Sequence, residues 1–218
     1  MADLEKAKAL KSQVGKLNGT LIAVSKNFSA DDVKSVYGAG VRDFGENYLS
    51  EALEKIDELK ELNINWHFIG RVQSGTLNKL VNRFYMIHSL YKEEHISKIN
   101  DRSDQKQKVL LQLQHKSDKR GFGLSEVELN DMLKKVPEYK NIDFSGLMFM
   151  PPAELQGEDL KSALQWAYGV FQTAKNNVKE TKNSWDTMSM GMSSDYELAL
   201  ESGSTHVRIG TAIFGKIK

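Results

Sequence analysis

The chain of 218 residues contains no cysteine and only 3 prolines. Without cysteine there is no disulfide, no thiolate metal ligand and no cysteine nucleophile. Two of the prolines are adjacent, at Pro151 and Pro152, and no low-complexity tract separates one half of the chain from the other. Because nothing marks a linker, we predict a single domain over residues 1–218.

No charge of one sign dominates either, because 30 lysine and arginine residues are balanced by 29 aspartate and glutamate residues. A nucleic-acid surface normally shows a basic run or basic residues interleaved with aromatic ones, and neither is present. No apolar stretch is long enough to cross a bilayer, and residues 1–16 alternate charged and apolar side chains instead of forming a signal peptide. These absences predict a soluble cytoplasmic protein that binds neither nucleic acid nor membranes.

Short apolar runs recur along the chain, separated by longer amphipathic stretches. Continuous apolar runs are typical of parallel strands that are buried on both faces. The expected strands are residues 21–24, 41–44, 66–69, 85–88, 109–113, 144–148, 187–190 and 206–209. The stretches between them show helical spacing, for example Leu49, Leu53, Ile56 and Leu59, or Leu124, Val127, Leu129 and Leu133.

Ser29 and Ser125 stand where helices are expected to begin, and serine is a favourable N-cap residue. Alternating strands and helices over this length fit either a doubly wound sheet or a closed (β/α)8 TIM barrel, and the number of strands favours the barrel. In both folds ligands bind at the carboxyl ends of the strands. The residues that follow each apolar run are therefore the candidates for function.

Two segments near the C-terminus, 189–195 and 203–211, place glycine and hydroxyl residues where an apolar strand stops. Backbone N–H groups at a strand-to-helix junction lack partners and carry the positive end of the helix dipole, and glycine lets an anion approach the main chain. We therefore predict that Ser193, Gly210 and Thr211 hold a phosphate group. Turn glycines with capping hydroxyls would give the same pattern.

Lys26 ends the first expected strand and would face these glycines across the mouth of a barrel. An amine there suits imine formation with an aldehyde that is anchored by a phosphate, and a solvated surface lysine is the alternative. Arg208 lies inside an apolar run, where its charge needs a partner such as a carboxylate or an aromatic nitrogen. The alternative for Arg208 is a structural ion pair with Asp195 or Glu46.

Other site classes find no support in the sequence. The 5 histidines do not have the spacing of a metal site. No GxSxG nucleophile elbow occurs, and the turn Gly38-Ala39-Gly40 lacks the GxGxxG pattern of nicotinamide binding. We therefore expect no metal, no serine hydrolase site and no dinucleotide.

A series of ordered motifs over nearly the whole chain resembles the pyridoxal phosphate (PLP) homeostasis proteins, single-domain relatives of the alanine racemase N-terminal barrel. The motifs are residues 23–26 (Ala-Val-Ser-Lys), 44–48 (Phe-Gly-Glu-Asn-Tyr), 66–70 (Trp-His-Phe-Ile-Gly), 73–74 (Gln-Ser), 88–89 (His-Ser), 146–148 (Gly-Leu-Met), 189–193 (Ser-Met-Gly-Met-Ser) and 207–215 (Val-Arg-Ile-Gly-Thr-Ala-Ile-Phe-Gly). So many matches in one order are far more specific than any single motif.

The resemblance implies a barrel in which Lys26 forms a Schiff base with pyridoxal 5'-phosphate, while Ser193, Gly210 and Thr211 hold its phosphate. Arg208 would meet the pyridine nitrogen and keep it unprotonated, which weakens the cofactor as an electron sink. The other residues that the resemblance implies around the cofactor are Asn47, His67, Ser89, Met148 and Ile209.

The resemblance also implies a role in intracellular PLP (vitamin B6) homeostasis, in which the protein buffers PLP or hands it transiently to PLP-dependent apoenzymes and affects amino-acid balance. Alanine racemases take a second base from an added β domain, and no such domain follows the eighth expected strand, so we expect no catalysis. The alternative is a weak amino-acid racemase or another PLP-dependent enzyme with Lys26 as base. A phosphate-sugar aldolase is a third possibility, and the protein is expected to be a monomer.

Overall fold

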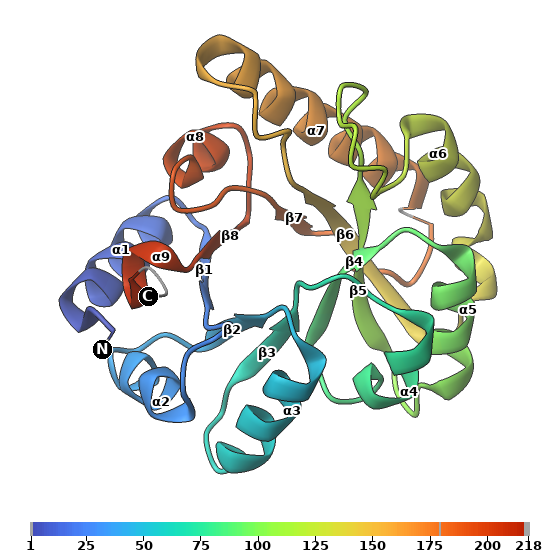
Figure 1. Ribbon diagram of the computed structural model, residues 1–218. Coiled ribbons are helices and arrows are strands. Elements are labelled where there is room, and N and C mark those ends of the chain that lie inside the picture. Colours follow the sequence, from blue (N-terminus) through green and yellow to red (C-terminus); the bar gives the residue numbers. More distant parts are fainter. Residues whose placement is uncertain (1, 179, 216–218) are drawn as a thin grey trace.

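The protein is a closed barrel of eight parallel strands, β1 to β8, that follow one another around the barrel in chain order (Figure 1). The computed structural model describes residues 2–178 and 180–215. Residues 1, 179 and 216–218 of the predicted domain lie outside the described residues. The barrel closes where β1 pairs with β8, so that Ile22 lies opposite Asp43 on one side and Arg208 on the other. The predicted (β/α)8 fold is confirmed.

Helices alternate with the strands and form a ring around the barrel (Figure 1). The strands are β1 (Thr20–Val24), β2 (Asp43–Glu46), β3 (Asn65–Phe68), β4 (Met86–Leu90), β5 (Gln107–Leu113), β6 (Ile142–Phe149), β7 (Thr187–Ser189) and β8 (His206–Ile209). The helices are α1 (Leu4–Lys16), α2 (Ala30–Gly38), α3 (Leu49–Glu58), α4 (Leu77–Leu80), α5 (Glu93–Arg102), α6 (Glu126–Lys135), α7 (Gly157–Val178), α8 (Tyr196–Glu201) and α9 (Thr211–Phe214), with short 3-10 turns at Ser74–Thr76 and Val136–Glu138. No helix among these is both long and apolar enough to cross a membrane.

Both predicted N-caps are confirmed, and each belongs to a capping box. The Ser29 hydroxyl accepts a hydrogen bond from the Asp32 N–H at the start of α2, and the Asp32 carboxylate accepts one from the Ser29 N–H. Ser125 and Glu128 make the same exchange at the start of α6. Each cap satisfies backbone donors that the helix leaves open and contributes about 1 kcal/mol.

The expected second strand was placed two residues too early. It was predicted at 41–44 and forms at Asp43–Glu46, because Gly40 has a φ of 97° and the turn out of α2 continues through Val41. The fourth strand also begins one residue later than expected, since Tyr85 is 42% exposed and precedes β4.

The predicted apolar face of α6 was wrong at Val127, which is 72% exposed. Leu124 does not belong to this helix, because it pairs with Leu113 at the end of β5. The helix begins only at Glu126, and its buried residues include Leu129 and Leu133. The apolar residues therefore come from two elements and do not share one helical face.

The main apolar core lies between the barrel and the surrounding helices, where outward-facing strand residues such as Val207 and Ile209 pack. Inside the barrel there is a smaller apolar cluster of Met86, Leu110 and Met148. The rest of the interior contains buried polar side chains, among them His67 and His88. Barrel interiors are usually filled by bulky branched apolar residues, so this polar interior is a departure that calls for a chemical explanation.

Candidate functional site

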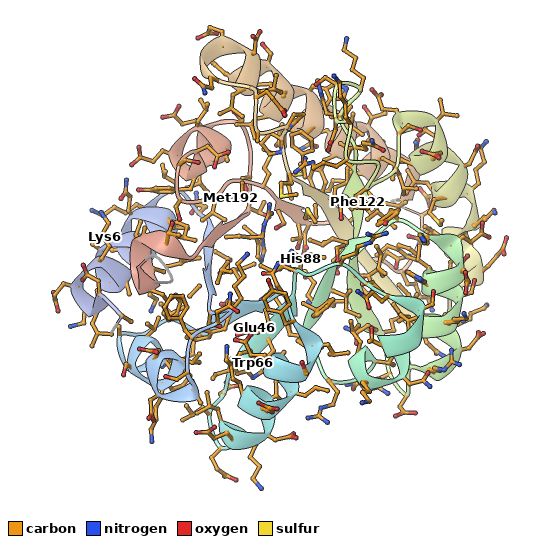
Figure 2. All side chains as sticks on the ribbon, viewed as in Figure 1. Lys6, Glu46, Trp66, His88, Phe122 and Met192 are labelled. Atoms are coloured by element: carbon orange, nitrogen blue, oxygen red, sulfur yellow. The ribbon has the colours of Figure 1, made fainter. Side chains whose placement is uncertain are left out.

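A cavity of about 580 Å³ opens at the carboxyl ends of the strands. Figure 2 shows two of its lining residues, Met192 and Phe122, on either side of the barrel axis. Three cationic side chains line the cavity, Lys26, Arg71 and Arg208, and no carboxylate of the described residues does. A cavity with this charge favours an anionic ligand.

Eight of the ten residues predicted around the ligand line this cavity. They are Lys26, Asn47, Ser89, Met148, Ser193, Arg208, Gly210 and Thr211. They come from the ends of different strands, as expected for a ligand site on a barrel. The sequence reasoning therefore located the cavity, although which atoms contact a ligand stays a prediction.

The other two predicted residues, His67 and Ile209, do not line the cavity. Side chains alternate along a strand, so His67 and Ile69 face the same way, and Ile69 is the one nearer the opening. Ile69 lines the cavity, whereas His67 is fully buried in the barrel interior. Ile209 alternates with Arg208, so its side chain packs in the outer core instead.

The loops after β7 and β8 meet at the predicted phosphate site. The Thr211 hydroxyl donates to the Ser193 hydroxyl oxygen at 3.1 Å and joins the two loops. The backbone N–H groups of Ser193, Ser194 and Thr211 have no acceptor within residues 2–178 and 180–215. A Cβ atom at Gly210 would lie only 3.2 Å from the Val24 oxygen, so glycine keeps this loop close to β1. Hydroxyls and free N–H groups of this kind suit a phosphate.

Lys26 follows β1 directly, and its amine makes no hydrogen bond or ion pair with any described residue. The neighbouring Asn27 has a φ of 64°, a left-handed backbone conformation that asparagine tolerates. Phe28 then stacks on Phe214 of α9, with ring centroids 4.9 Å apart. The lysine loop is therefore packed beside the helix that follows the phosphate site. The expectation that Lys26 faces the glycines near β8 across the mouth of the barrel is wrong, because β1 and β8 are neighbours in the barrel.

A second lysine, Lys55 of α3, is buried behind this loop and was not predicted. Its Nζ donates to the Ser25 carbonyl oxygen at 2.7 Å, to Glu46 Oε1 at 2.8 Å and to Glu51 Oε1 at 2.5 Å. Glu51 Oε1 also accepts from the Asn27 N–H at 2.6 Å. The backbone is thus held on both sides of Lys26. All three N–H donors of the Lys55 ammonium group are in use, in contrast to those of Lys26.

Glu46 is the buried partner of this second lysine. Burial raises the pKa of the Glu46 carboxyl, although Lys55 and the Ser25 hydroxyl both donate hydrogen bonds to it. The carboxylate has 0% exposure, so its charge depends on these donors. Sequence reasoning missed Lys55 because lysines on amphipathic helices are nearly always solvated.

Arg208 is buried, and its partners are neutral. Its guanidinium group donates from Nη1 to the Ser189 hydroxyl oxygen at 2.8 Å and from Nη2 to the Phe149 carbonyl oxygen at 3.1 Å. The expected alternative of an ion pair with Asp195 or Glu46 is wrong, because Asp195 accepts from the Met192 N–H and Glu46 pairs with Lys55. Burial lowers the pKa of Arg208 to about 10, which the Asp195 charge partly opposes.

Further lining residues were not predicted, and Arg71 is the most informative of them. Its guanidinium lies 4.3 Å from the ring centroid of Phe122, which also lines the cavity. Arg71 directly follows Gly70 at the end of β3, so the rule about strand ends could have found it. Phe122, in contrast, comes from the long loop between β5 and α6, whose path no local pattern fixes.

The loops after β2 and β3 approach each other closely at Gly70. A Cβ atom there would lie 1.9 Å from the Asn47 carbonyl oxygen, so only glycine allows this contact. The Ser89 hydroxyl donates to the Gly70 carbonyl oxygen and extends the contact to β4. Asn47 lines the cavity with its side-chain oxygen buried and without a partner among the described residues, as expected for a group that serves a ligand.

Comparison with known proteins identifies the family. The alanine racemase N-terminal domain family matches residues 4–217. The chain is 36% identical over 200 residues to a pyridoxal phosphate homeostasis protein of Synechocystis, covering 89% of this chain and 90% of that protein. It is 34% identical over 205 residues to the protein of the same name from Escherichia coli, covering 90% of this chain and 85% of the relative.

Solved structures agree with these matches. PipY of Synechococcus elongatus, whose structure has PLP bound, is similar with a TM-score of 0.90 and 30% identity, covering 97% of this chain and 99% of PipY. Alanine racemase from Corynebacterium glutamicum shares only the fold, with a TM-score of 0.71, 13% identity and coverage of 97% of this chain and 61% of the racemase. This chain therefore belongs to the pyridoxal phosphate homeostasis protein family.

Proposed function

We propose that this protein binds PLP through a Schiff base at Lys26 and acts in PLP homeostasis, holding the cofactor and delivering it to apoenzymes. The observation that carries the proposal is the unengaged amine of Lys26 in a cationic cavity that Ser193 and Thr211 also line. The structure of the relative PipY has PLP bound, which supports PLP as the ligand.

The residues present fit this cofactor. Ser193, Gly210 and Thr211 would hold the phosphate through hydroxyl and N–H donors, and the unpartnered amide oxygen of Asn47 suits the polar ring substituents. When bound, PLP supplies an aldehyde that condenses with an amine, with loss of water, and a ring that withdraws electrons from the new bond. Arg208 would donate to the pyridine nitrogen from N–H groups that have no acceptor among the described residues.

Arg208 also supports a carrier rather than an enzyme. A guanidinium donates a hydrogen bond to the ring nitrogen without giving up its proton, so the nitrogen stays neutral and the ring stabilises a carbanion poorly. Family relatives are named for homeostasis and not for a reaction.

One observation favours a weak racemase as the second candidate. The Tyr91 side chain lines the cavity and could serve as the second acid or base beside Lys26. Incubation with single enantiomers of several amino acids, followed by chiral chromatography, tests this function. Steady turnover that is lost in both Lys26→Ala and Tyr91→Phe would establish the enzyme.

Cofactor transfer tests the carrier function. We expect the PLP-loaded protein to activate a PLP-dependent apoenzyme faster than PLP dissociates from it into buffer. The release rate is measured separately with a phosphatase that destroys free PLP, and the same phosphatase is present during the transfer. Activation that is no faster than release, or that the phosphatase abolishes, would exclude direct delivery.

Thr211→Val tests the phosphate site. The substitution keeps the shape of the side chain and removes one hydroxyl donor, so we expect PLP affinity to fall about tenfold, the value of one hydrogen bond to a charged group near the surface. Thr173→Val on the exposed side of α7 is the matched control and should leave affinity unchanged. Fluorescence titration with PLP measures the affinity of both variants. Equal affinities of Thr211→Val and Thr173→Val would show that Thr211 does not belong to the phosphate site.

A further inference from the structure

A continuous series of hydrogen bonds crosses the barrel interior and ends at Arg208. The interior chain, as we name it, consists of Asp43, His67, His88, Ser189 and Arg208. Its three inner contacts are Asp43 Oδ1 to His67 Nε2 at 3.1 Å, His67 Nδ1 to His88 Nε2 at 2.9 Å, and His88 Nδ1 to Ser189 Oγ at 3.1 Å. Arg208 Nη1 then donates to Ser189 Oγ at 2.8 Å. Figure 2 shows His88 close to the barrel axis.

The interior chain spans the barrel between its two ends. Asp43 is the first residue of β2, and Asn65, which donates to the same carboxylate oxygen at 3.0 Å, is the first residue of β3. Arg208 lines the cavity at the opposite ends of the strands. The middle members, His67, His88 and Ser189, have 0% exposure, so the series is shielded from water. In the described part of the chain no three acidic or histidine side chains form a metal site, and these contacts are hydrogen bonds.

The two ends fix the direction of every hydrogen bond between them. Arginine can only donate, so the Ser189 oxygen accepts, and the remaining acceptor for the Ser189 hydroxyl proton is His88 Nδ1. His88 must then carry its own proton on Nε2 and donate it to His67 Nδ1. His67 in turn carries its proton on Nε2 and donates to Asp43, which can only accept. This assignment leaves both imidazoles neutral and all the bonds pointing toward Asp43.

The charges agree with this assignment. Burial raises the pKa of Asp43, but hydrogen bonds from His67 and Asn65 outweigh it and hold the pKa below its ordinary value, so the carboxylate is ionised. Burial lowers the pKa of His88 well below its ordinary value, and the charge of Arg208 acts in the same direction. Arg208 makes no ion pair with a described carboxylate. The interior chain therefore has one negative end, one positive end and neutral groups between them.

We propose that Asp43 is the counter-charge of Arg208 and acts on it through the interior chain, as a positioning residue for the ligand site. A carboxylate in direct contact would take two guanidinium donors in a bidentate pair. The interior chain uses a single donor, Nη1 to Ser189, and leaves other donors for a ligand. The effect of this coupling on the PLP ring nitrogen rests on the proposed function, in which Arg208 donates to that nitrogen.

A double-mutant cycle tests this coupling. Asp43→Asn keeps the shape and an oxygen acceptor for His67 but removes the charge, and Ser189→Ala removes the link next to Arg208. We expect each to weaken PLP binding about fivefold, and Asp43→Asn to add less than about twofold in the Ser189→Ala background. Asp186→Asn is the matched control, because this exposed carboxylate lies before β7 at the same end of the barrel as Asp43 but outside the interior chain. Asp186→Asn should leave the affinity for PLP unchanged.

Nitrogen-15 NMR of the histidines in the PLP-free protein supplies a readout that does not depend on the cofactor. We expect His67 and His88 both to be neutral with the proton on Nε2. A proton on Nδ1 of either ring, an unchanged affinity in Asp43→Asn, or fully additive effects of the two substitutions would overturn the inference. If the unaltered protein bound no PLP, the proposed function would fail, while the tautomers and the same cycle measured on Tm would still decide the coupling.

Discussion

Replacing Lys26 by alanine is expected to abolish the borohydride-reducible adduct with PLP while leaving weak noncovalent binding. Lys26 is the cavity amine that makes no hydrogen bond or ion pair with a described residue, whereas the buried Lys55 has all its donors in hydrogen bonds. The proposed phosphate contacts of Ser193 and Thr211 do not depend on the amine, so we expect them still to hold the phosphate. Absorbance spectra and intact-mass spectrometry after borohydride reduction measure the adduct directly.

Lys79→Ala is the matched control for this experiment. Lys79 is an exposed lysine on α4, close in sequence to the cavity residue Arg71 but outside the cavity lining. Its loss should leave the adduct intact. A reduced adduct that persists in Lys26→Ala, with peptide mapping to another lysine, would show that the imine assignment is wrong.

Lys55→Met is expected to destabilise the protein by about 3–5 kcal/mol, which lowers Tm by about 10 °C in a domain of this size. The side chain is similar in length, but Glu46 would stay buried without its cationic partner. The Ser25 carbonyl would lose its donor as well, so the lysine loop should be less well held and PLP should load more slowly. Thermal denaturation and the rate of the absorbance change on adding PLP measure the two effects.

A surface ion pair provides the comparison for this substitution. Lys98 and Glu94 form a pair one turn apart on the exposed side of α5, and Lys98→Met should barely change Tm because exposed pairs contribute little. Adding Glu46→Gln to Lys55→Met should restore part of the stability, since the stranded charge is then removed. A Tm for Lys55→Met that matches that of Lys98→Met would contradict a structural role for the buried pair.

The fold and most of the site could be predicted because they follow from local patterns. Buried parallel strands give continuous apolar runs, and ligand sites on such a barrel lie at strand ends, which is why Lys26, Ser193 and Thr211 could be predicted at the cavity that they line. His67 and Ile209 do not line the cavity, because His67 lies deeper in the barrel interior and the Ile209 side chain faces the outer core. Strict alternation from the cavity residue Arg208 would have excluded the Ile209 side chain, but alternation does not exclude His67, which faces the same way as Ile69.

The buried polar network could not be predicted, because it depends on contacts between distant segments. Whether Lys55 is solvated depends on how α3 packs on β2. Nothing in the sequence of α3 indicates that the Lys55 amine will meet acceptors on Glu46 and Ser25. The partner of Arg208 depends on the register of β7 against β8, which sets Ser189 beside it. The sequence offered a carboxylate, Asp195 or Glu46, only as the alternative partner of Arg208, and no local pattern pointed to the neutral Ser189.

The closure of the barrel between β1 and β8 has a consequence for biosynthesis. Lys26 is made early, but the Gly210 and Thr211 that complete its cavity are among the last described residues to leave the ribosome. A growing chain can therefore present the amine long before it can enclose a ligand, and contacts so distant in sequence form late in folding. Binding of PLP must therefore follow synthesis of β8, and bound PLP cannot stabilise the nascent protein before that point.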